Sequence, residues 1–221
     1  MPEFKGDVFK ARTEGGPLKA IMHYQYASMS KDDPNGEPGQ TIFSALIESG
    51  IEPSDYISFC SLRKWQPATD IANVTELIYV HSKLLIVDDK HTIIGSANFN
   101  DRSQEGCRDS EFCLYFKDTD ESSFAKSLRL RLWSVFLGVE VTEEDVPESG
   151  EFYEKWTGVS QNNTDIFEEV FKLAPTDVIH DFDTLEEYGG TREGDMLEGN
   201  DPEAARARLE EVSGVLSKYF I

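Results

Sequence analysis

Cysteine is scarce in this 221-residue sequence, and long hydrophobic runs are missing from it. The three cysteines, Cys60, Cys107 and Cys113, cannot build a disulfide framework, and none is spaced with a histidine as metal ligands are. We therefore expect ordinary thiols, a reducing compartment and no metal. No run of about 18 apolar residues occurs, so no membrane-spanning helix is expected. The first ten residues contain no apolar signal region, which indicates an intracellular start or the interior of something longer. The localisation that we expect is cytoplasmic.

Positive charge is also scarce, since 21 Lys and Arg stand against 42 Asp and Glu, which gives a formal net charge of −21. Such a chain repels nucleic acid at long range, so no nucleic-acid partner is expected. The acidic residues concentrate after Glu140, where we interpret them as solvated surface. Hydrophobic residues make up 39% of the chain, which is enough for a packed core. No internal repeat is visible.

Hydrophobic periodicity predicts alternating helices and strands, and hence an α/β layered fold. The predicted elements are, in chain order, a helix from residue 17, a loop at 31–39, a helix at 42–47 closed by Gly50, strands at 55–62, 74–88, 92–98 and 110–117, a helix at 123–138, short helices at 152–156 and 165–173, an acidic connection at 183–200, and a helix opened by Asp201 and Pro202. The helix at 123–138 should present as its apolar face Phe124, Leu128, Leu132, Val135 and Phe136. The last helix should bury Leu209, Val212, Leu216 and Phe220.

One segment in the middle of the sequence carries a pattern that suits phosphodiester chemistry. If residues 74–88 form a strand, His81 and Lys83 share a face, because side chains alternate along a strand. A tight turn then returns the chain, and on the next strand Ser96 and Asn98 share a face. The pattern therefore predicts that His81, Lys83 and Asn98 converge on one spot.

These three side chains can bind and cleave a phosphodiester. Lys83 offers a positive charge to one non-bridging oxygen, and Asn98 offers amide donors to another. Both can stabilise charge on the phosphoryl oxygens in the transition state. The imidazole of His81 can attack phosphorus or protonate a leaving oxygen. This chemistry needs neither a metal nor a cofactor.

A lone H-x-K would be incidental on most strands, but here the pattern is longer. His81-x-Lys83 is followed after four residues by Asp88, and after six more by Gly95-Ser96-x-Asn98. So many fixed positions at fixed spacing are hard to obtain by chance, which favours the functional interpretation.

Residues 81–88 (HSKLLIVD) resemble the HKD motif of the phospholipase D superfamily, and residues 95–103 (GSANFNDRS) resemble its extension in the eukaryotic phosphatidylcholine-hydrolysing branch. Other segments that fit this branch are 18–26, 56–62, 75–80 and 108–111. The resemblance implies that residues 1–175 are the C-terminal catalytic lobe, with the motif at 81–98. That lobe would be an α/β/α sandwich with a mixed sheet, one half of the two-lobed phospholipase D fold. Residues 176–221 would be an acidic linker and a C-terminal helix.

The resemblance also implies the reaction, in which phosphatidylcholine is hydrolysed to phosphatidic acid and choline through a phosphohistidine. Two HKD motifs face each other in the family, and this one looks like the second. His81 would then be the general acid and base. Lys83, Ser96 and Asn98 would bind or support the phosphate.

Three further roles follow from the same resemblance. Asp88 and Gly95 would be structural residues of the motif. Glu111 matches the acidic residue that orients the histidine of the opposite motif, and a plain surface carboxylate is the alternative.

No second motif is present, because His23, His91 and His180 do not begin an H-x-K. We expect a truncated gene product or fragment that needs an N-terminal HKD half, or a second copy across a two-fold axis, to complete the site. Three hypotheses stay open: half of a phosphatidylcholine phospholipase D, a homodimeric single-HKD phosphodiesterase or nuclease, and a catalytically inactive fragment. The net charge disfavours a polyanionic substrate. The first hypothesis implies a phospholipid substrate and peripheral membrane contact.

Overall fold

The computed structural model describes part of the chain, namely residues 42–52, 55–69, 72–98, 100–119, 123–146, 150–172, 195–196 and 201–218. The predicted helix from residue 17, the loop at 31–39 and most of the acidic connection at 183–200 lie outside the described residues.

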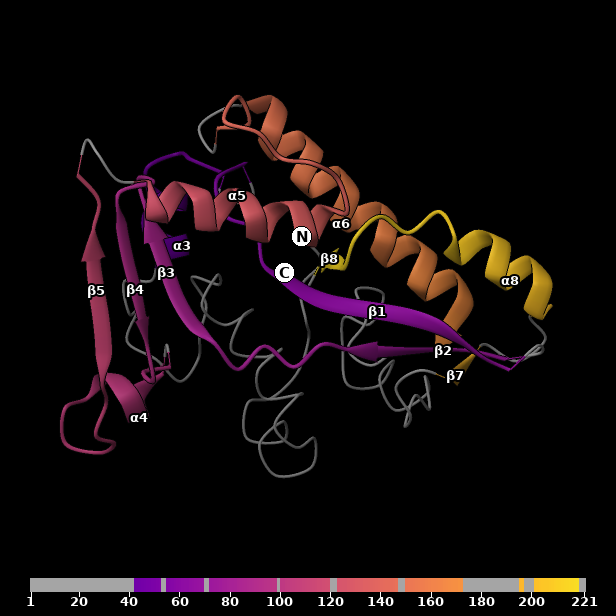
Figure 1. Ribbon diagram of the computed structural model, residues 1–221, viewed down its shortest axis with the longest axis horizontal. Coiled ribbons are helices and arrows are strands. Elements are labelled where there is room, and N and C mark those ends of the chain that lie inside the picture. The colour runs from indigo at the N-terminus through magenta and orange to yellow at the C-terminus, as the bar shows by residue number, and fades with distance from the viewer. Residues whose placement is uncertain are drawn as a thin grey trace.

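The described chain combines helices with antiparallel sheets, which agrees with the predicted α/β class (Figure 1). The elements are α3 (Ile42–Glu48), β1 (Cys60–Thr69), β2 (Ala72–Leu77), β3 (Lys83–Val87), β4 (His91–Gly95), α4 (Asp101–Gln104), β5 (Cys113–Lys117), α5 (Phe124–Leu137), α6 (Gly150–Val170), β6 (Phe171–Lys172), β7 (Asp195–Met196), α8 (Pro202–Leu209) and β8 (Leu216–Lys218). The strands form sheets of order β2-β1-β8, β3-β4-β5 and β6-β7. Every described pairing is antiparallel, and the three-layer sandwich with a mixed sheet stays a prediction.

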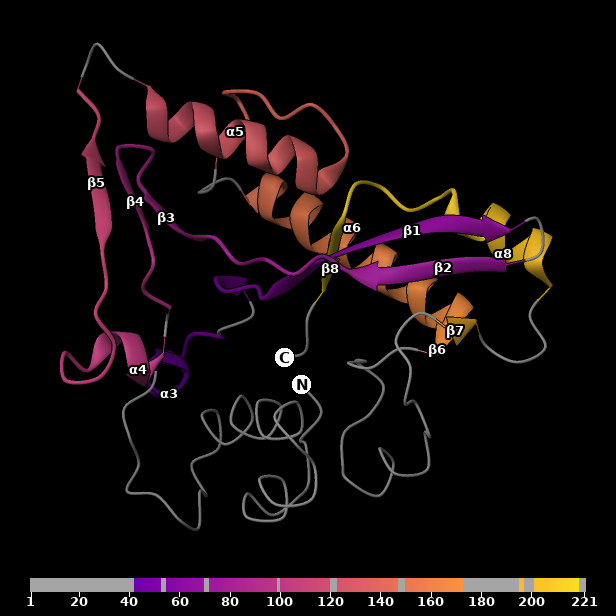
Figure 2. The ribbon, with the colours of Figure 1, turned by 60° about the horizontal axis from the view of Figure 1, so that its bottom comes forward.

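Strands β1, β2 and β8 with helices α6 and α8 form what we call the packed body, in which α6 crosses the β1–β2 hairpin (Figures 1 and 2). Ile166 and Phe167 of α6 pack with Leu209 of α8, and all three are fully buried. Half-buried Trp65 of β1 lies against this cluster. A second cluster joins the end of α5 to α6 and β8 through Leu137, Val141, Phe152 and Leu216.

Two glycines bring the end of α5 against the chain segment that enters β8. Gly138 (φ 70°) and Gly214 (φ 66°) both adopt the left-handed conformation, and a Cβ on either would overlap the backbone of the other. Val215 then bridges two elements, because its N–H donates to the Phe136 carbonyl (2.9 Å) while its carbonyl accepts from the Arg63 N–H (2.8 Å). The segment that enters β8 is therefore hydrogen-bonded to both α5 and β1.

Several predicted elements are confirmed. A helix covers residues 42–48, and Gly50 follows it with a φ of 74°. Helix α5 ends at Gly138 as expected. Asp201 caps α8, because its carboxylate accepts from the Glu203 N–H, and Pro202 opens the helix.

The predicted strand at 74–88 is wrong, because it is two strands of different sheets. β2 ends at Leu77, where the Ile78 N–H still donates to the Leu62 carbonyl of β1 (2.6 Å). β3 begins at Lys83 and pairs with β4 instead. Residues 78–82 carry the chain from one sheet to the other. Their apolar sequence looks like strand, but no one sheet can continue through them.

Three helix predictions also need correction. The two short helices predicted at 152–156 and 165–173 are one continuous helix, α6, because its buried residues keep helical spacing throughout. The C-terminal helix ends at Leu209, and Leu216 lies in β8 opposite Leu62. The buried residues of α5 are Ala125, Arg129 and Leu137, whereas Val135 is 58% exposed. The buried face of α5 therefore contains Arg129, and it is not the face that apolar periodicity predicted.

Within the described residues, no helix combines the length and the apolar character that crossing a bilayer requires.

Candidate active site

Strands β3, β4 and β5, which we call the site sheet, bring the predicted site residues to one of its ends. Lys83 pairs with Gly95, and Gly95 pairs with Cys113. Since neighbouring strands run in opposite directions, the residues before Lys83, after Gly95 and before Cys113 lie at the same end. This end is beside α4 in Figure 1. The residues gathered there are His81, Lys83, Ser96, Asn98 and Glu111.

His81 and Asn98 lie just outside the strands, although the sequence predicted both within them. His81 belongs to the crossing between β2 and β3, and Asn98 follows the end of β4. The Lys83 ammonium donates to the His81 carbonyl (2.5 Å), and the Tyr79 ring stacks on the His81 imidazole with centroids 6.0 Å apart. Strand alternation therefore does not position His81, and its immediate neighbours Tyr79 and Lys83 contact it instead.

Ser96 ties Glu111 to the end of the sheet. Its hydroxyl donates to Glu111 Oε2 (2.5 Å) and accepts from the Phe112 N–H (3.0 Å), while its own N–H donates to the Phe112 carbonyl (2.9 Å). The pKa of Glu111 is lowered, first by a hydrogen bond from Ser103, then by that from Ser96, and more weakly by the Lys83 charge. Glu111 is consequently an ionised acceptor at this end of the sheet.

Helix α4 holds the backbone of Asn98. The Asn98 N–H donates to the Ser103 hydroxyl (3.0 Å), and the Gln104 amide donates to the Asn98 carbonyl (2.9 Å). Among the described residues its carboxamide has no partner, so it is available to a ligand. Ser103 thus contacts both Asn98 and Glu111, and sequence reasoning missed it, although it lies within the GSANFNDRS segment.

Gly95 and Asp88 occupy positions with special backbone demands. A Cβ on Gly95 would lie 2.7 Å from the Phe112 carbonyl oxygen, so a side chain there would push β5 away. Asp88 lies in the turn between β3 and β4 with a φ of 54°, and the next residue, Asp89, has a φ of 52°. Asp89 pairs with Arg129, another contact that sequence reasoning missed.

The gathered residues are open to solvent. His81, Ser96, Asn98 and Glu111 are exposed, and Lys83 is half-buried. A hollow of about 650 Å³ lies on the β1–β2 hairpin, and its lining extends to Tyr79, whose ring stacks on His81. No cluster of three or more His, Cys, Asp or Glu that could hold a metal ion occurs among the described residues. Chemically, the arrangement offers the His81 imidazole, the Lys83 ammonium and the Asn98 carboxamide to an anionic ligand, while the Ser96 hydroxyl is engaged with the Glu111 carboxylate. That His81, Lys83 and Asn98 meet on one phosphate stays a prediction.

Comparison with known proteins gives consistent matches. A family model described as phospholipase D matches residues 65–180. The chain is 37% identical over 235 residues to phospholipase D1 of Homo sapiens, covering 99% of this chain and 21% of that protein. It is 33% identical to phospholipase D2 of Bos taurus, with 99% and 24% covered, and 36% identical to phospholipase D zeta 1 of Arabidopsis thaliana, with 81% and 17% covered. The chain therefore spans about a fifth of the length of these curated relatives.

Proposed function

Because the chain belongs to the phospholipase D family, we propose that it supplies the second HKD half of an enzyme that hydrolyses phosphatidylcholine to phosphatidic acid and choline. The observation that carries the proposal is the gathering of His81, Lys83, Ser96, Asn98 and Glu111 at one solvent-open end of the site sheet. Relatives named phospholipase D over nearly the whole chain support the same reaction class.

The mechanism divides the work between two histidines. A histidine of the other HKD half attacks phosphorus, and the choline oxygen leaves with a proton from His81. His81, now neutral, takes a proton from a water molecule. The resulting hydroxide attacks phosphorus, breaks the phosphohistidine bond and releases phosphatidic acid. Lys83 and Asn98 hold the non-bridging oxygens through both steps and stabilise the charge that develops on them.

Glu111 serves the facing histidine in this proposal. A carboxylate that accepts a hydrogen bond from one imidazole N–H fixes the tautomer, so the other ring nitrogen keeps the free lone pair that attacks phosphorus. Glu111 is held by Ser96 and Ser103, and the lowering of its pKa keeps it ionised, as this role requires.

The substrate should be a zwitterionic lipid met at a membrane surface. A chain with a net charge of −21 is repelled by anionic surfaces but not by a phosphatidylcholine bilayer. Peripheral contact at the cytoplasmic face, aided by the partner half, is therefore the mode of membrane binding that we propose.

The test is to reconstitute the site from two chains. This chain is co-expressed with the N-terminal half of its own gene, or of a matched relative, and assayed with fluorescent phosphatidylcholine in the presence of ethanol. We expect phosphatidic acid and phosphatidylethanol, with loss of at least about 1,000-fold in His81→Ala, on the scale of removing a general acid and base.

The matched control is His91→Gln. His91 is in the same sheet but at the opposite end, where its Nδ1 hydrogen-bonds the Tyr115 hydroxyl (2.7 Å), and its replacement should preserve activity. If no phosphatidylethanol forms even with the partner half, the proposal fails. If the isolated chain is active only as a dimer, the homodimeric phosphodiesterase replaces it.

A further inference from the structure

We propose that Arg129 of α5 is a positioning residue of the active site, because it fixes through Asp89 the hairpin β3–β4 whose other end carries the site. This inference rests on the proposed function. In this proposal the residue that holds the hairpin turn in place is Asp89, which lies outside the HKD pattern, and not Asp88.

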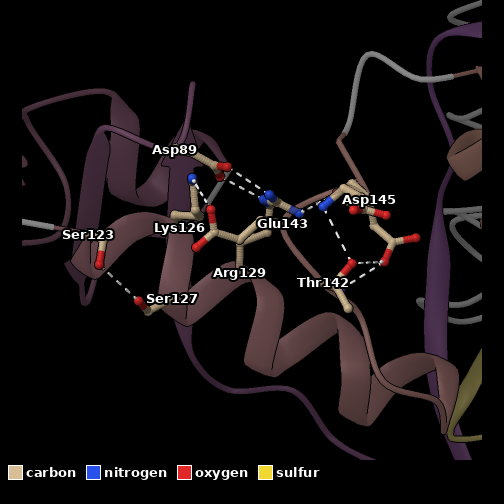
Figure 3. Close-up of polar contacts among 9 residues, drawn as sticks. Asp89, Ser123, Lys126, Ser127, Arg129, Thr142, Glu143 and Asp145 are labelled. Carbon is tan, nitrogen blue, oxygen red and sulfur yellow. Dashed lines mark hydrogen bonds and ion pairs between the residues drawn. The ribbon is translucent and has the colours of Figure 1, made fainter.

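The Arg129–Asp89 contact is bidentate and buried (Figure 3). Arg129 Nε lies 2.6 Å from Asp89 Oδ1, and Nη2 lies 2.7 Å from Oδ2. Arg129 is only 4% exposed. Two parallel charge-assisted hydrogen bonds fix the direction of the carboxylate as well as its distance. The turn is therefore held in orientation, which a single flexible contact would not achieve.

Arg129 also reaches two other parts of the structure. Its Nη1 donates to the Asp145 carbonyl (3.2 Å), and its guanidinium lies over the Trp133 ring, 4.5 Å from the centroid. Trp133 packs against the cluster that contains Leu137 and Leu216 of the described core. One side chain thus connects the turn of the site sheet with the packed body.

The turn needs an external constraint because of its backbone. Asp88 and Asp89 both adopt a left-handed conformation, with φ of 54° and 52°. Asp enters this conformation more readily than most residues with side chains, but two successive residues stay in it only when neighbouring contacts hold them there. Of the two, Asp89 has the buried partner, whereas Asp88 is exposed. The ion pair consequently supplies the constraint.

The hairpin transmits this constraint to the site. Five consecutive residue pairs run from Val87–His91 beside the turn to Lys83–Gly95 beside the site. Helix α5 also touches the sheet at the turn end, where Phe124 packs on Phe116 with ring centroids 5.3 Å apart. The sheet is thus anchored at one end and carries the chemistry at the other. A small rotation at the anchor displaces Lys83 and the residues that flank it.

The experiment separates positioning from stability by neutralising the pair. In the assembled two-half enzyme, Arg129→Met combined with Asp89→Asn removes both charges while keeping volume and a residue that tolerates the left-handed conformation. We expect a melting temperature close to that of the wild type, a kcat lowered about tenfold and an unchanged KM. An unaltered kcat at unaltered melting temperature would overturn the proposal.

The matched control is Lys126→Met combined with Glu143→Gln, which removes an ion pair between α5 and the turn that follows it (3.1 Å; Figure 3). It should leave kcat unchanged. If the neutralised pair fails to fold, Arg129→Lys decides, because lysine keeps the charge but not the bidentate geometry. A folded Arg129→Lys variant with full kcat contradicts the proposal, and one with reduced kcat and unchanged KM supports it.

A second readout needs no activity and so distinguishes failure of this inference from failure of the proposed function. The NMR resonances of the His81 ring can be assigned in the isolated chain by comparison with His81→Gln. They should shift in the Arg129→Met, Asp89→Asn variant and stay unchanged in the Lys126→Met, Glu143→Gln control. Identical His81 resonances in the two variants would refute positioning, whether or not the assembled enzyme turns over lipid.

Discussion

The packed body and the site sheet differ in where they keep their apolar side chains. In the packed body Ile166, Phe167 and Leu209 have no exposed surface. In the site sheet Leu85 is 54% exposed and Leu114 50%. Both regions are rich in apolar residues, yet among the described residues only the packed body buries them as a core.

The difference indicates that stability and chemistry are separated in this chain. The packed body gains its free energy from buried area. In the part of the chain that the structure describes, the site sheet is held by a few specific contacts. One of them is made by the charged side chain of Arg129, which is buried. Mutations should therefore act on stability in the first region and on site geometry in the second.

The largest expected loss of stability follows from emptying the core of the packed body. Phe167→Ala should lower the free energy of unfolding by about 4 kcal/mol, because a fully buried aromatic leaves a cavity. Leu85→Ala in the site sheet should change it by no more than about 0.5 kcal/mol. Denaturant titration of both variants checks the contrast, and comparable losses would contradict it.

Breaking the anchor of the site sheet should cost nearly as much. Arg129→Ala leaves the Asp89 carboxylate without its buried partner and should destabilise the chain by about 3 kcal/mol. Hydrogen exchange should then show faster opening in β3 and β4 than in α6. Uniform acceleration across α6 as well would show that the two regions do not separate as described.

One substitution should stabilise the site sheet. Thr92 of β4 is 1% exposed, and its hydroxyl has no hydrogen-bond partner in the part of the chain that the structure describes. Thr92→Val keeps the shape and removes the unsatisfied group, so a gain of about 1 kcal/mol is expected. Thermal unfolding measures this gain in stability. Thr75→Val is the control and should lose stability, because the Thr75 hydroxyl donates to the Lys64 carbonyl (3.0 Å) in the packed body.

The smallest effect concerns the pH dependence at the site. The pKa of Glu111 is lowered from its ordinary 4.5, so its ionised form stabilises the fold above that pH, and this contribution is lost as the pH falls through the lowered pKa. Ser103→Ala, and then Ser96→Ala, should raise the pKa toward its ordinary value. Carboxyl NMR titration of Glu111 follows this, and an unchanged midpoint in both variants would contradict the assignment.

Sequence patterns predicted the elements that depend on local signals. Gly138 marked the end of α5, and Asp201 and Pro202 marked the start of α8. The residues of the motif are gathered at one end of the site sheet, and their convergence on one phosphate stays a prediction. They failed where partners are distant in the sequence. Leu216 looks like the continuation of a helix, and only its pairing with Leu62 makes it a strand.

The same limit explains the missed anchor. A charged residue on a helix is normally predicted to face solvent, so apolar periodicity selected the face of α5 that contains Val135 and not that of Arg129. The carboxylate of Asp89 makes the burial of Arg129 possible. It lies forty residues earlier in the sequence, in the predicted turn between two strands. Residue types alone do not reveal such a pair.

Because the segment that enters β8 bonds to both α5 and β1, the order in which the chain folds during synthesis is constrained. Asn163, fully buried in α6, donates to the carbonyls of Ser213 and Leu216, and β1 meets β8 across more than 150 residues. The hairpin β3–β4 joins residues that are close in the sequence, and its anchor Arg129 also precedes β8, so both can be present before the packed body closes. Closure of the packed body must wait for residues 213–218 to emerge. A ribosome stalled before them would therefore display the β3–β4 hairpin on an unfinished support.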